Sequence, residues 1–372
     1  MSRTLRAVAH GIPEVNFGRG PSFRLGVEEE FILVDAETGA VAHTGSDLLP
    51  RLPIDSPHGR FAPDTYEAEI ELKAPISADA GEAFDHLIHL RADLGAAGAS
   101  AIGAGIHPDA VFGDVVHVPG ERYAAIVAML RGLITRTPTA ATHVHVGMPD
   151  PATAILAYNG LRSHLPLLQA LSANSPFWFG KDSGFDSSRA QLFRAYPRAA
   201  IPPAFRGFPD YERTIEAVVS SAEIADYTFL WWDVRPHPLL GTVEVRAMDA
   251  QSDPRAVAAL AALVHGLALH EVASPSRAVD SGILMESSFR AARDGLRATI
   301  WFDGALHPVV DVARRAVALA RRHVDVPALE EVERILSDGN GADRQRAVHA
   351  REGMRGLLRH LAAETLGAPA PQ

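Results

Sequence analysis

Side chains alternate between two sides of an extended backbone in four stretches of the chain, and this period of two predicts β-strands. The stretches are 23–34 (FRLGVEEEFILV), 65–75 (TYEAEIELKAP), 142–148 (THVHVGM) and 227–251, the last as two strands joined across RPHPLLG. A further apolar stretch at 99–108 (ASAIGAGIHP) reads as a buried strand that stops at its proline. Strands are therefore expected mainly in the first two-thirds of the chain.

Apolar residues with the spacing of an α-helix lie between and after these strands. Residues 78–98, 121–137 and 151–171 each predict a helix, and almost everything after residue 254 reads as helical. Strands crowded before helices indicate an α+β fold, a mainly antiparallel sheet backed by helices, because a dinucleotide-binding fold would alternate strand and helix.

We expect a single domain over 22–365, sheet-rich at 22–252 and mostly helical at 253–365, with a loose arm at 1–21 and a frayed tail at 366–372. This follows because the first residues lack periodicity and the last ones, GAPAPQ, cannot continue a helix.

One long segment, 175–210, departs from both periods and is rich in Gly, Pro, Ser and aromatic residues. A connection of this length is usually functional or disordered. Its six Phe and one Trp argue against disorder, so we expect a functional loop.

The most apolar stretch, 256–273, is long enough to raise the question of a membrane helix. His265, His270 and Glu271 interrupt it, and it is rich in Ala rather than Leu or Ile. We therefore expect a helix buried in a protein core, and no membrane partner.

The composition of the chain bears on its partners, on its location and on the kinds of site it can form. Acidic residues outnumber basic ones by 45 to 35, which gives a formal charge of −10 and makes a nucleic-acid partner improbable. The chain has no cysteine, which excludes disulfides, zinc–thiolate sites and a cysteine nucleophile. The first residues lack the apolar core of a signal peptide, and we expect a cytoplasmic protein.

Two of the strands carry an unusual number of carboxylates. Glu28 and Glu30 share one side of the first strand, whereas Glu29 points the other way. Glu67, Glu69 and Glu71 likewise share one side of the second. Solvated strand faces or acidic residues that protect a sheet edge would explain these patterns without function. A divalent cation would instead relieve the repulsion between the carboxylates.

The other two strands carry complementary groups. His143 and His145 share a face, and so do Glu244 and Arg246, with Arg235 just before the turn. Hydrogen-bonded core histidines and a simple ion pair are the alternatives to a metal and phosphate site. Taken together, carboxylates, histidines and arginines on one face of four strands suit Mg²⁺ or Mn²⁺ and the phosphates that these ions bridge.

Other nucleotide-binding and hydrolase motifs are missing. FGKDSGF lacks the spacing of a phosphate-binding P-loop, GAGIHP is a poor dinucleotide fingerprint, and there is no G-x-S-x-G. A metal-dependent hydrolase could use the same acids and histidines, but it would not need Arg235 and Arg246 in the site. A non-catalytic nucleotide-binding relative would bind without turnover.

Five stretches together resemble the carboxylate–amine ligases of the glutamate–cysteine ligase type 2 family: GVEEEF, YEAEIEL, THVHVGM, SPFWFGKDSGFDSSR and WWDVRPHPLLGTVEVRAMD. ESSFRAARDGL at 286–296 is similar to a C-terminal stretch of that family, and the resemblance spans about residues 22–300. The wider superfamily includes glutamine synthetase, with E-x-E, H-x-H and E-x-R on three strands. Here these motifs are Glu28 and Glu30, His143 and His145, and Glu244 and Arg246.

The resemblance implies an open, curved antiparallel sheet that forms a funnel and binds ATP with Mg²⁺ or Mn²⁺. It implies a C–N ligase, unrelated to the ATP-grasp enzymes, that joins a small carboxylate to a small amine through an acyl phosphate. Glutamate–cysteine ligation would be a main or side activity, and a homodimer is compatible with this picture.

We assign the expected site residues on these grounds. The metal ligands would be Glu28, Glu30, Glu67, Glu71, His143 and Glu244. Catalysis would rest on Arg235, Glu244 and Arg246, and the nucleotide or substrate would be held by His145, Arg189, Arg235 and Arg246.

Overall fold

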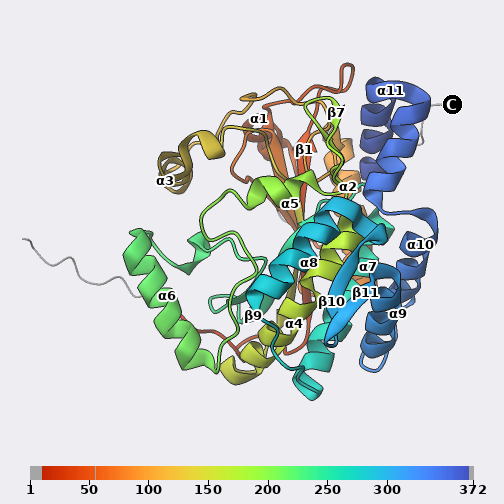
Figure 1. Cartoon of the computed structure of the whole chain (residues 1–372). Helices are drawn as coiled ribbons and strands as arrows, with labels where there is room; N and C mark the ends of the chain where they lie inside the picture. Colours follow the sequence, from red (N-terminus) through yellow and green to blue (C-terminus); the bar gives the residue numbers. More distant parts are fainter. Residues whose placement is uncertain (1–10, 55, 368–372) are drawn as a thin grey trace, which may run out of the picture.

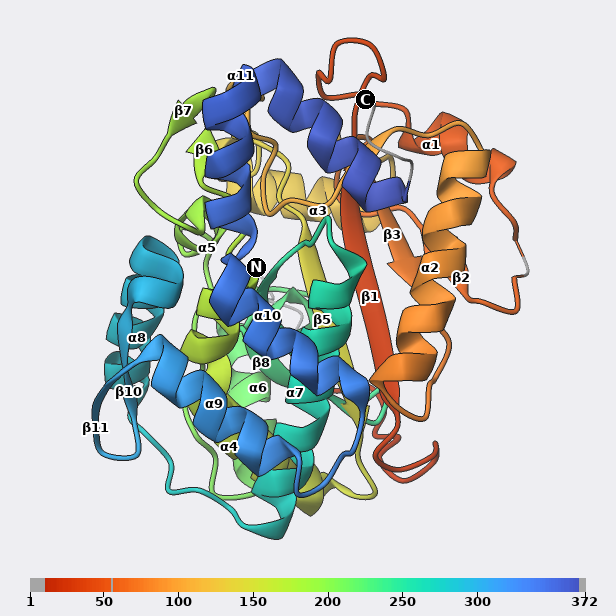
Figure 2. The same ribbon diagram turned by 90° about the vertical axis from the view of Figure 1, so that its right-hand side faces the viewer.

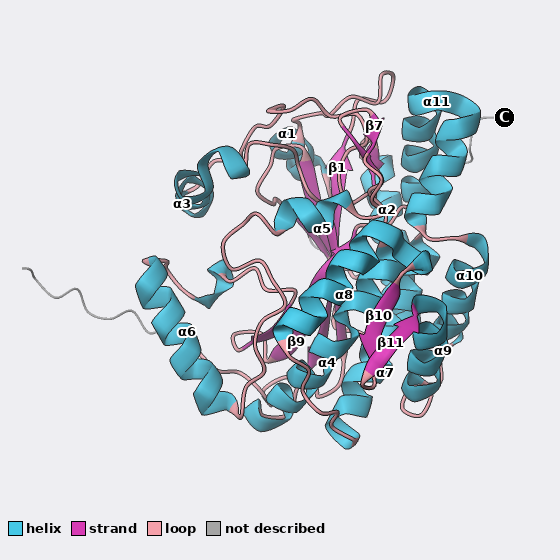
Figure 3. Ribbon diagram, viewed as in Figure 1, coloured by secondary structure: helices cyan, strands magenta, loops and turns pink. Residues whose placement is uncertain are grey.

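A seven-stranded antiparallel sheet organises the computed structural model, which describes residues 11–54 and 56–367 (Figures 1 and 3). The strand order is β2-β3-β1-β5-β9-β8, and the short β4 pairs with the end of β1. The strands are β1 (Leu25–Leu33), β2 (Arg60–Ala62), β3 (Glu69–Lys73), β4 (Ala101–Ile102), β5 (Ala141–Gly147), β8 (Val234–His237) and β9 (Thr242–Asp249).

One face of this sheet is apolar because every second residue of its strands has an apolar side chain, and these side chains point to the same face. Val144 and Val146 of β5 and Val243 and Val245 of β9 are fully buried in the main hydrophobic core. Helices α2 (Ala80–Ala96), α4 (Pro151–Ser172) and α7 (Pro254–Ala273) pack against this face. The expected α+β fold, an antiparallel sheet backed by helices, is confirmed.

Helix α7 is the membrane-length stretch of the sequence, and it lies inside the protein. Among the described residues it is the one helix long and apolar enough to cross a membrane, and 78% of its apolar stretch is buried. It packs between the sheet, α4 and the outer helices α9 (Val309–Ala320) and α10 (Glu331–Asp338). The expectation of a buried core helix is met.

The last third forms an outer layer that is not wholly helical. It contains α8 (Ser281–Asp294), α9, α10 and α11 (Gly341–Leu366). Figure 2 shows α9, α10 and α11 toward the viewer and α8 at the left edge. A hairpin of β10 (Thr299–Phe302) and β11 (Ala305–Pro308) interrupts them. The sequence prediction missed this hairpin because each strand has only four residues, too few for a period to emerge.

Three other segments are more irregular than expected. The predicted strand at 99–108 reduces to the two residues of β4, and the predicted strand at 65–75 begins only at Glu69. The long segment 175–210 contains the two-residue strands β6 (Phe177–Trp178) and β7 (Lys181–Asp182) and the short helix α5 (Ser188–Phe193).

Helices α1 (Gly45–Leu48), α3 (Glu121–Leu130) and α6 (Phe208–Ala222) complete the described elements of regular helix. In Figure 1, α3 and α6 lie on the side of the sheet away from α9, α10 and α11. Ile126 and Leu130 of α3 line a small cavity at the polar face, which is the face of the sheet opposite the apolar core. Helix α6 instead contacts α4, and its Tyr211 and Ile215 belong to the main core.

The described part of the arm expected at 1–21 makes hydrogen bonds to the rest of the chain. Asn16 N donates to Pro238 O at 2.8 Å, and Gly18 N donates to Met148 O at 3.0 Å. These bonds fix the segment against β8, β9 and the end of β5, because the turns that follow these strands offer free carbonyls. Residues 1–10 and, from the expected tail, 368–372 lie outside the described residues.

Candidate active site

The three consecutive glutamates of β1 divide between the two faces of the sheet. Glu29 faces the apolar core, is fully buried and accepts a hydrogen bond from Arg91 Nε of α2 at 3.0 Å. Arg91 also donates to the carbonyls of Gln251, Ser252 and Thr365. Glu29 therefore has a structural partner, whereas Glu28 and Glu30 lie on the polar face.

The histidines of β5 lie next to these two glutamates. Strand pairing places His143 directly opposite Glu28 of β1, and His145 opposite Glu244 of β9. His143 Nδ1 is 3.6 Å from Glu28 Oε2, and its Nε2 is 3.6 Å from Glu30 Oε1. His145 Nε2 is 3.7 Å from both Glu28 Oε2 and Glu244 Oε1. Residues from three strands thus meet around Glu28.

Two sets of three potential ligands result, and Glu28 belongs to both. One set is Glu28, Glu71 and His143, and the other is Glu28, His145 and Glu244; the ligand atoms of each set lie within 4.8 Å of one another. Carboxylate oxygens with one imidazole nitrogen are a donor set suited to Mg²⁺ or Mn²⁺.

The protonation of these groups also fits a cation. Burial and the nearby Arg246 lower the pKa of His143 to about 3, so its imidazole is neutral. Burial raises the pKa of Glu28, but His143, His145 and Lys73 outweigh it and hold the pKa well below the ordinary value. His145 Nε2 is buried without a hydrogen-bond partner among the described residues. An unpartnered buried nitrogen beside ionised carboxylates is what a ligand nitrogen requires.

Lys73, at the end of β3, neutralises part of this negative charge. Its Nζ lies 2.7 Å from Glu71 Oε2 and 3.2 Å from Glu28 Oε1. Burial lowers the pKa of Lys73, and the two carboxylates more than reverse this, so the net shift is upward. Its ammonium therefore remains charged. It lies between Glu28 and Glu71, at the set of potential ligands that also contains His143.

Glu244 is held between two arginines. Arg235 Nε donates to Glu244 Oε2 at 2.6 Å, and Arg246 pairs with Glu244 Oε1. Burial raises the pKa of Glu244, but Arg235 and Arg246 overcome it, and the pKa lies well below the ordinary value. Arg235 also donates to the carbonyls of Thr228 and Leu230, so its guanidinium is fixed in place.

A small cavity of 90 Å³ lies at one end of this cluster. Its lining includes Glu30, His143, Arg189 and Arg246. Burial, assisted by Asp64, raises the pKa of Glu30 to about 8, although Arg189 and Arg246 oppose the shift. Arg189 Nε and Arg246 Nε are both buried without a hydrogen-bond partner among the described residues. The cavity therefore offers unused guanidinium donors.

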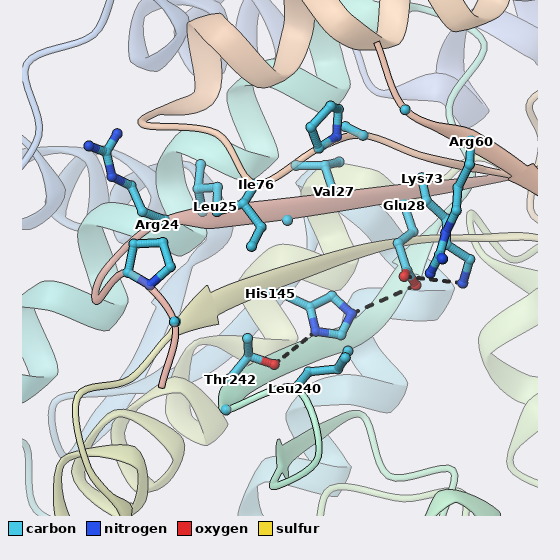
Figure 4. Close-up of a pocket in the computed structure, with 18 of the residues that line it drawn as sticks. Arg24, Leu25, Val27, Glu28, Arg60, Lys73, Ile76, His145, Leu240 and Thr242 are labelled. Atoms are coloured by element: carbon cyan, nitrogen blue, oxygen red, sulfur yellow. Dashed lines mark hydrogen bonds and ion pairs between the residues drawn. The ribbon is translucent and has the colours of Figure 1, made fainter. Parts of the chain in front are cut away.

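A larger cavity of 570 Å³ lies at the other end, and Figure 4 shows its lining. Glu28 and His145 form part of its wall, with His145 also hydrogen-bonded to Thr242 Oγ1 at 3.0 Å. Three cationic side chains and an apolar set line the rest: Arg24, Arg60 and Lys73, with Ile54, Ile76 and Leu240. The carboxylate–histidine cluster thus separates two cavities of different size.

The expected site residues are brought together with one exception. Glu67 lies in the loop before β3, where its carboxylate accepts from Ser46 N at 2.9 Å and from Ser46 Oγ at 2.7 Å. It belongs to neither set of potential ligands among the described residues. The irregular backbone before Glu69 breaks the period of two that would have aligned Glu67 with Glu71.

Sequence reasoning passed over two residues that reach the site. Lys73 is two positions after Glu71, so the same period of two would have placed it on the polar face. Asp64, which lines the small cavity, lies on a loop, and no local pattern points to it.

Comparison with protein families matches residues 24–364 to glutamate–cysteine ligase family 2. A protein of Rubrobacter xylanophilus is 39% identical to this chain, over 91% of this chain and 94% of its own. That protein is named glutamate–cysteine ligase 2-1, as an unproven assignment. A protein of Haloferax volcanii named glutamate–cysteine ligase is 34% identical, over 91% of this chain and 95% of its own.

Two solved structures share the fold. A glutamate–cysteine ligase from Francisella tularensis in complex with AMP superposes with a TM-score of 0.66 at 12% identity, over 94% of this chain and 90% of that chain. A bifunctional glutathione synthetase from Pasteurella multocida gives a TM-score of 0.69 at 16% identity, over 92% of this chain. The chain spans about half of that synthetase, 52% of its length.

Proposed function

Because the chain belongs to glutamate–cysteine ligase family 2, we propose that it is an ATP-dependent ligase that joins a small carboxylate to a small amine. The observation that carries the proposal is the position of Glu28, shared by two sets of potential metal ligands between a large and a small cavity. Such an arrangement brings a nucleotide and a carboxylate to the same cations from opposite ends.

The divalent cations would be held by Glu28, Glu71 and His143 on one side and by the carboxylates of Glu28 and Glu244 on the other, where His145 faces the nucleotide instead. Mg²⁺ or Mn²⁺, when bound, supplies positive charge that screens the substrate carboxylate from the triphosphate. Glu30 is a further candidate ligand, because its carboxylate is 3.6 Å from His143. Glu67 stays outside this set because Ser46 occupies its oxygens.

ATP fits the larger cavity in this proposal. At 570 Å³ the cavity falls in the ordinary range for small-molecule sites. The apolar side chains Ile54, Ile76 and Leu240 suit the base, and Arg24, Arg60 and Lys73 suit the phosphates. His145 lies on the cavity wall next to the carboxylate–histidine cluster, where it would donate a hydrogen bond to a phosphate oxygen of ATP. The AMP complex of the structurally similar Francisella ligase supports nucleotide binding on this fold.

The carboxylate substrate would approach from the small cavity, where Arg189 and Arg246 have unused donors. A carboxylate oxygen attacks the γ-phosphorus of ATP, ADP leaves, and an acyl phosphate forms. The amine then attacks the acyl carbon, loses a proton and releases phosphate, which leaves the amide. Arg246 and Arg235, both anchored by Glu244, would neutralise the charge that develops on the transferring phosphoryl group.

Glutamate and cysteine are the first substrate pair to test, because the family and the Haloferax relative carry that name.

The experiment is a screen for ADP release over pairs of carboxylates and amines in the presence of Mg²⁺. At least one pair should release ADP only when both partners are present, with an amide product visible by mass spectrometry. Glu244→Gln and Arg246→Ala should each lower turnover by about 10²–10³-fold, the usual effect of one lost transition-state contact. Arg213→Ala, at an exposed arginine of α6, is the control and should change nothing.

Melting temperatures of all variants accompany the kinetics. Turnover that persists in Glu244→Gln and Arg246→Ala at unchanged melting temperature would overturn the proposal. Unfolding of both variants would assign the pair a structural role instead.

A further inference from the structure

A second large cleft lies on the far side of the helices that back the sheet. Its volume is 1030 Å³, and its walls come from α4, residues 276–283, the turn of the β10–β11 hairpin and α9. Figure 2 shows this hairpin between α8 and α9. Its lining shares no residue with either cavity of the candidate active site. Helices α4 and α7 separate the cleft from the sheet.

Two polar side chains of α4 line the cleft with unused hydrogen-bonding atoms. His164 is 2% exposed, and its Nε2 donates to Glu271 Oε1 at 2.9 Å, while its Nδ1 has no partner among the described residues. Ser163 Oγ is also buried without a partner in the described part of the chain. Buried polar atoms are normally paired, so both point to a group that completes them.

The carboxylate behind His164 is already satisfied. Glu271 is fully buried and accepts hydrogen bonds from Ser276 N at 2.8 Å and Ser276 Oγ at 2.9 Å, besides that of His164. It therefore orients the imidazole with Nδ1 as the remaining nitrogen and has no need of a ligand itself.

The charges of the cleft favour an anion. Arg277, Arg315 and Arg322 line it, against Asp280 and Asp303. Over the described residues, no ion pair or side-chain hydrogen bond engages any of these three arginines. Asp280 is already occupied, because its carboxylate caps α8 by accepting from Gly282 N at 2.8 Å. Asp303 is exposed at the hairpin turn and also has no hydrogen bond or ion pair over the described residues, so the unpaired charges are three arginines against one aspartate.

Aromatic side chains supply an apolar wall. Trp301 and Phe302 of β10 line the cleft together with Ile283 and Leu319. The Phe302 ring lies 6.0 Å from that of His164, so the apolar wall and the unpartnered nitrogen are neighbours. Flat aromatic walls beside guanidinium groups are suited to a planar ring that bears an acidic group.

We propose that this cleft is a second ligand site, which binds a small organic anion with a planar ring and one carboxylate or phosphate group. The arginines bind the acidic group, Trp301 and Phe302 pack on the ring, and His164 and Ser163 complete the hydrogen bonds. The proposal does not rest on the ligase activity, since the cleft shares no residue with that site.

The test uses phenyl phosphate and benzoate as probes, with benzyl alcohol as the neutral analogue, and measures binding by ligand-observed NMR. The variant is Arg315→Ala combined with Arg322→Ala. Its matched control is Arg314→Ala combined with Arg321→Ala, the preceding residues, which do not line the cleft. Both pairs remove two exposed arginines from the same segment, so any general effect of net charge is shared.

At least one acidic probe should bind, and the cleft variant should weaken it about tenfold or more, because two charged hydrogen bonds are lost. The control should keep the affinity of the wild type, and benzyl alcohol should bind at least about tenfold more weakly than the acid. Preference for phenyl phosphate or for benzoate then decides which acidic group the site takes. Trp301→Leu should weaken both acids and leave the melting temperature within a few degrees.

Three binding results would overturn the proposal: neither acid binds, both double variants weaken binding equally, or Glu28→Gln rather than the cleft variant abolishes it. The last would assign the probe to the candidate active site. Sedimentation of the cleft variant is measured in parallel. A change in oligomeric state there would show that a second copy of the chain covers the cleft, which also contradicts the proposal.

Discussion

At the scale of single residues, adjacent glutamates of β1 have unrelated tasks. Glu28 joins the two sets of potential metal ligands, and Glu29 is paired with Arg91 in the core. Each role follows from the side of the strand to which the side chain points. In the proposed function, the same carboxylate chemistry therefore holds a cation at one position, and at the next it pairs with a buried arginine.

This contrast predicts opposite outcomes for two neighbouring substitutions. Glu29→Gln should lower the free energy of unfolding by about 3–5 kcal/mol, because it leaves a buried arginine without its counter-charge. Glu28→Gln should cost about 1 kcal/mol or less in stability and should abolish ligase turnover. Urea unfolding and ADP release measured on both variants check this. Equal losses of stability would show that the face assignment is wrong.

The two histidines of β5 should also differ. His143 lies between Glu28 and Glu30, whereas His145 lines the large cavity. His143→Ala should raise the Mg²⁺ concentration for half-maximal activity about ten- to hundredfold, and excess Mg²⁺ should partly restore turnover. His145→Ala should mainly raise the KM for ATP.

Titrations of activity against Mg²⁺ at saturating ATP, and against ATP at saturating Mg²⁺, separate these roles. His89→Ala, at an exposed position of α2, is the control. Identical profiles for the two strand variants would remove the distinction between a metal ligand and a phosphate contact.

At the scale of elements, close contact between helices depends on residues without side chains. A Cβ built on Gly266 of α7 would lie 2.5 Å from Ala320 Cβ and 2.7 Å from Ala320 Cα of α9. Such distances are far below van der Waals contact, and the backbone of α9 cannot rotate away as a flexible side chain could. Gly266 therefore sets the separation of the core helix from the outer layer.

Gly266→Ala should destabilise the protein by about 1–3 kcal/mol, because the two helices must move apart. Gly95→Ala in α2 is the matched control, since its Cβ would find no atom nearer than Leu366 Cβ at 3.9 Å. The control should stabilise the protein by about 0.5–1 kcal/mol through helix propensity. Thermal unfolding of both variants shows whether each substitution lowers or raises stability. A stabilising Gly266→Ala would contradict the packing argument.

At the scale of the whole molecule, the acidic cluster makes stability depend on pH and metal together. Burial raises the pKa of Glu30 to about 8, so folding retains a proton that the unfolded chain loses near its ordinary value. Burial, with Glu28, also raises the pKa of Glu71. The native state then binds more protons than the unfolded state between the two values, and stability falls as pH rises through that range.

In EDTA, a rise in pH from about 5 to about 8 should therefore lower the free energy of unfolding of the wild type more than that of Glu30→Gln. At pH about 8, saturating Mg²⁺ should make the wild type more stable than Glu30→Gln. Only the wild type has an ionised carboxylate at position 30 beside the cation, and a cation that binds the native state stabilises it. Denaturant unfolding at both pH values, with and without Mg²⁺, provides the measurement. A difference between wild type and variant that is independent of pH would show that Glu30 titrates normally.

The sequence by itself determined the class of fold and which side chains of the candidate site share a face of each strand. Its period of two assigned Glu28 and Glu30 to one face and Glu29 to the other, and it paired His143 with His145 and Glu244 with Arg246. The apolar run at 256–273 predicted the buried helix that became α7. These predictions succeeded because alternation and helical spacing are local properties, which neighbouring residues fix without knowledge of the rest of the chain.

Only the tertiary structure decided which of these faces meet and how. Glu28 lies opposite His143 because β1 pairs with a strand more than a hundred residues later, and no local pattern encodes that register. The loop before β3 turned Glu67 towards Ser46, while Lys73 and Asp64 reached the site from positions that had not been singled out. The second cleft likewise arises where α4, the hairpin and α9 come together, because its arginines, aromatic rings and histidine are distant in sequence and share only a place in the fold.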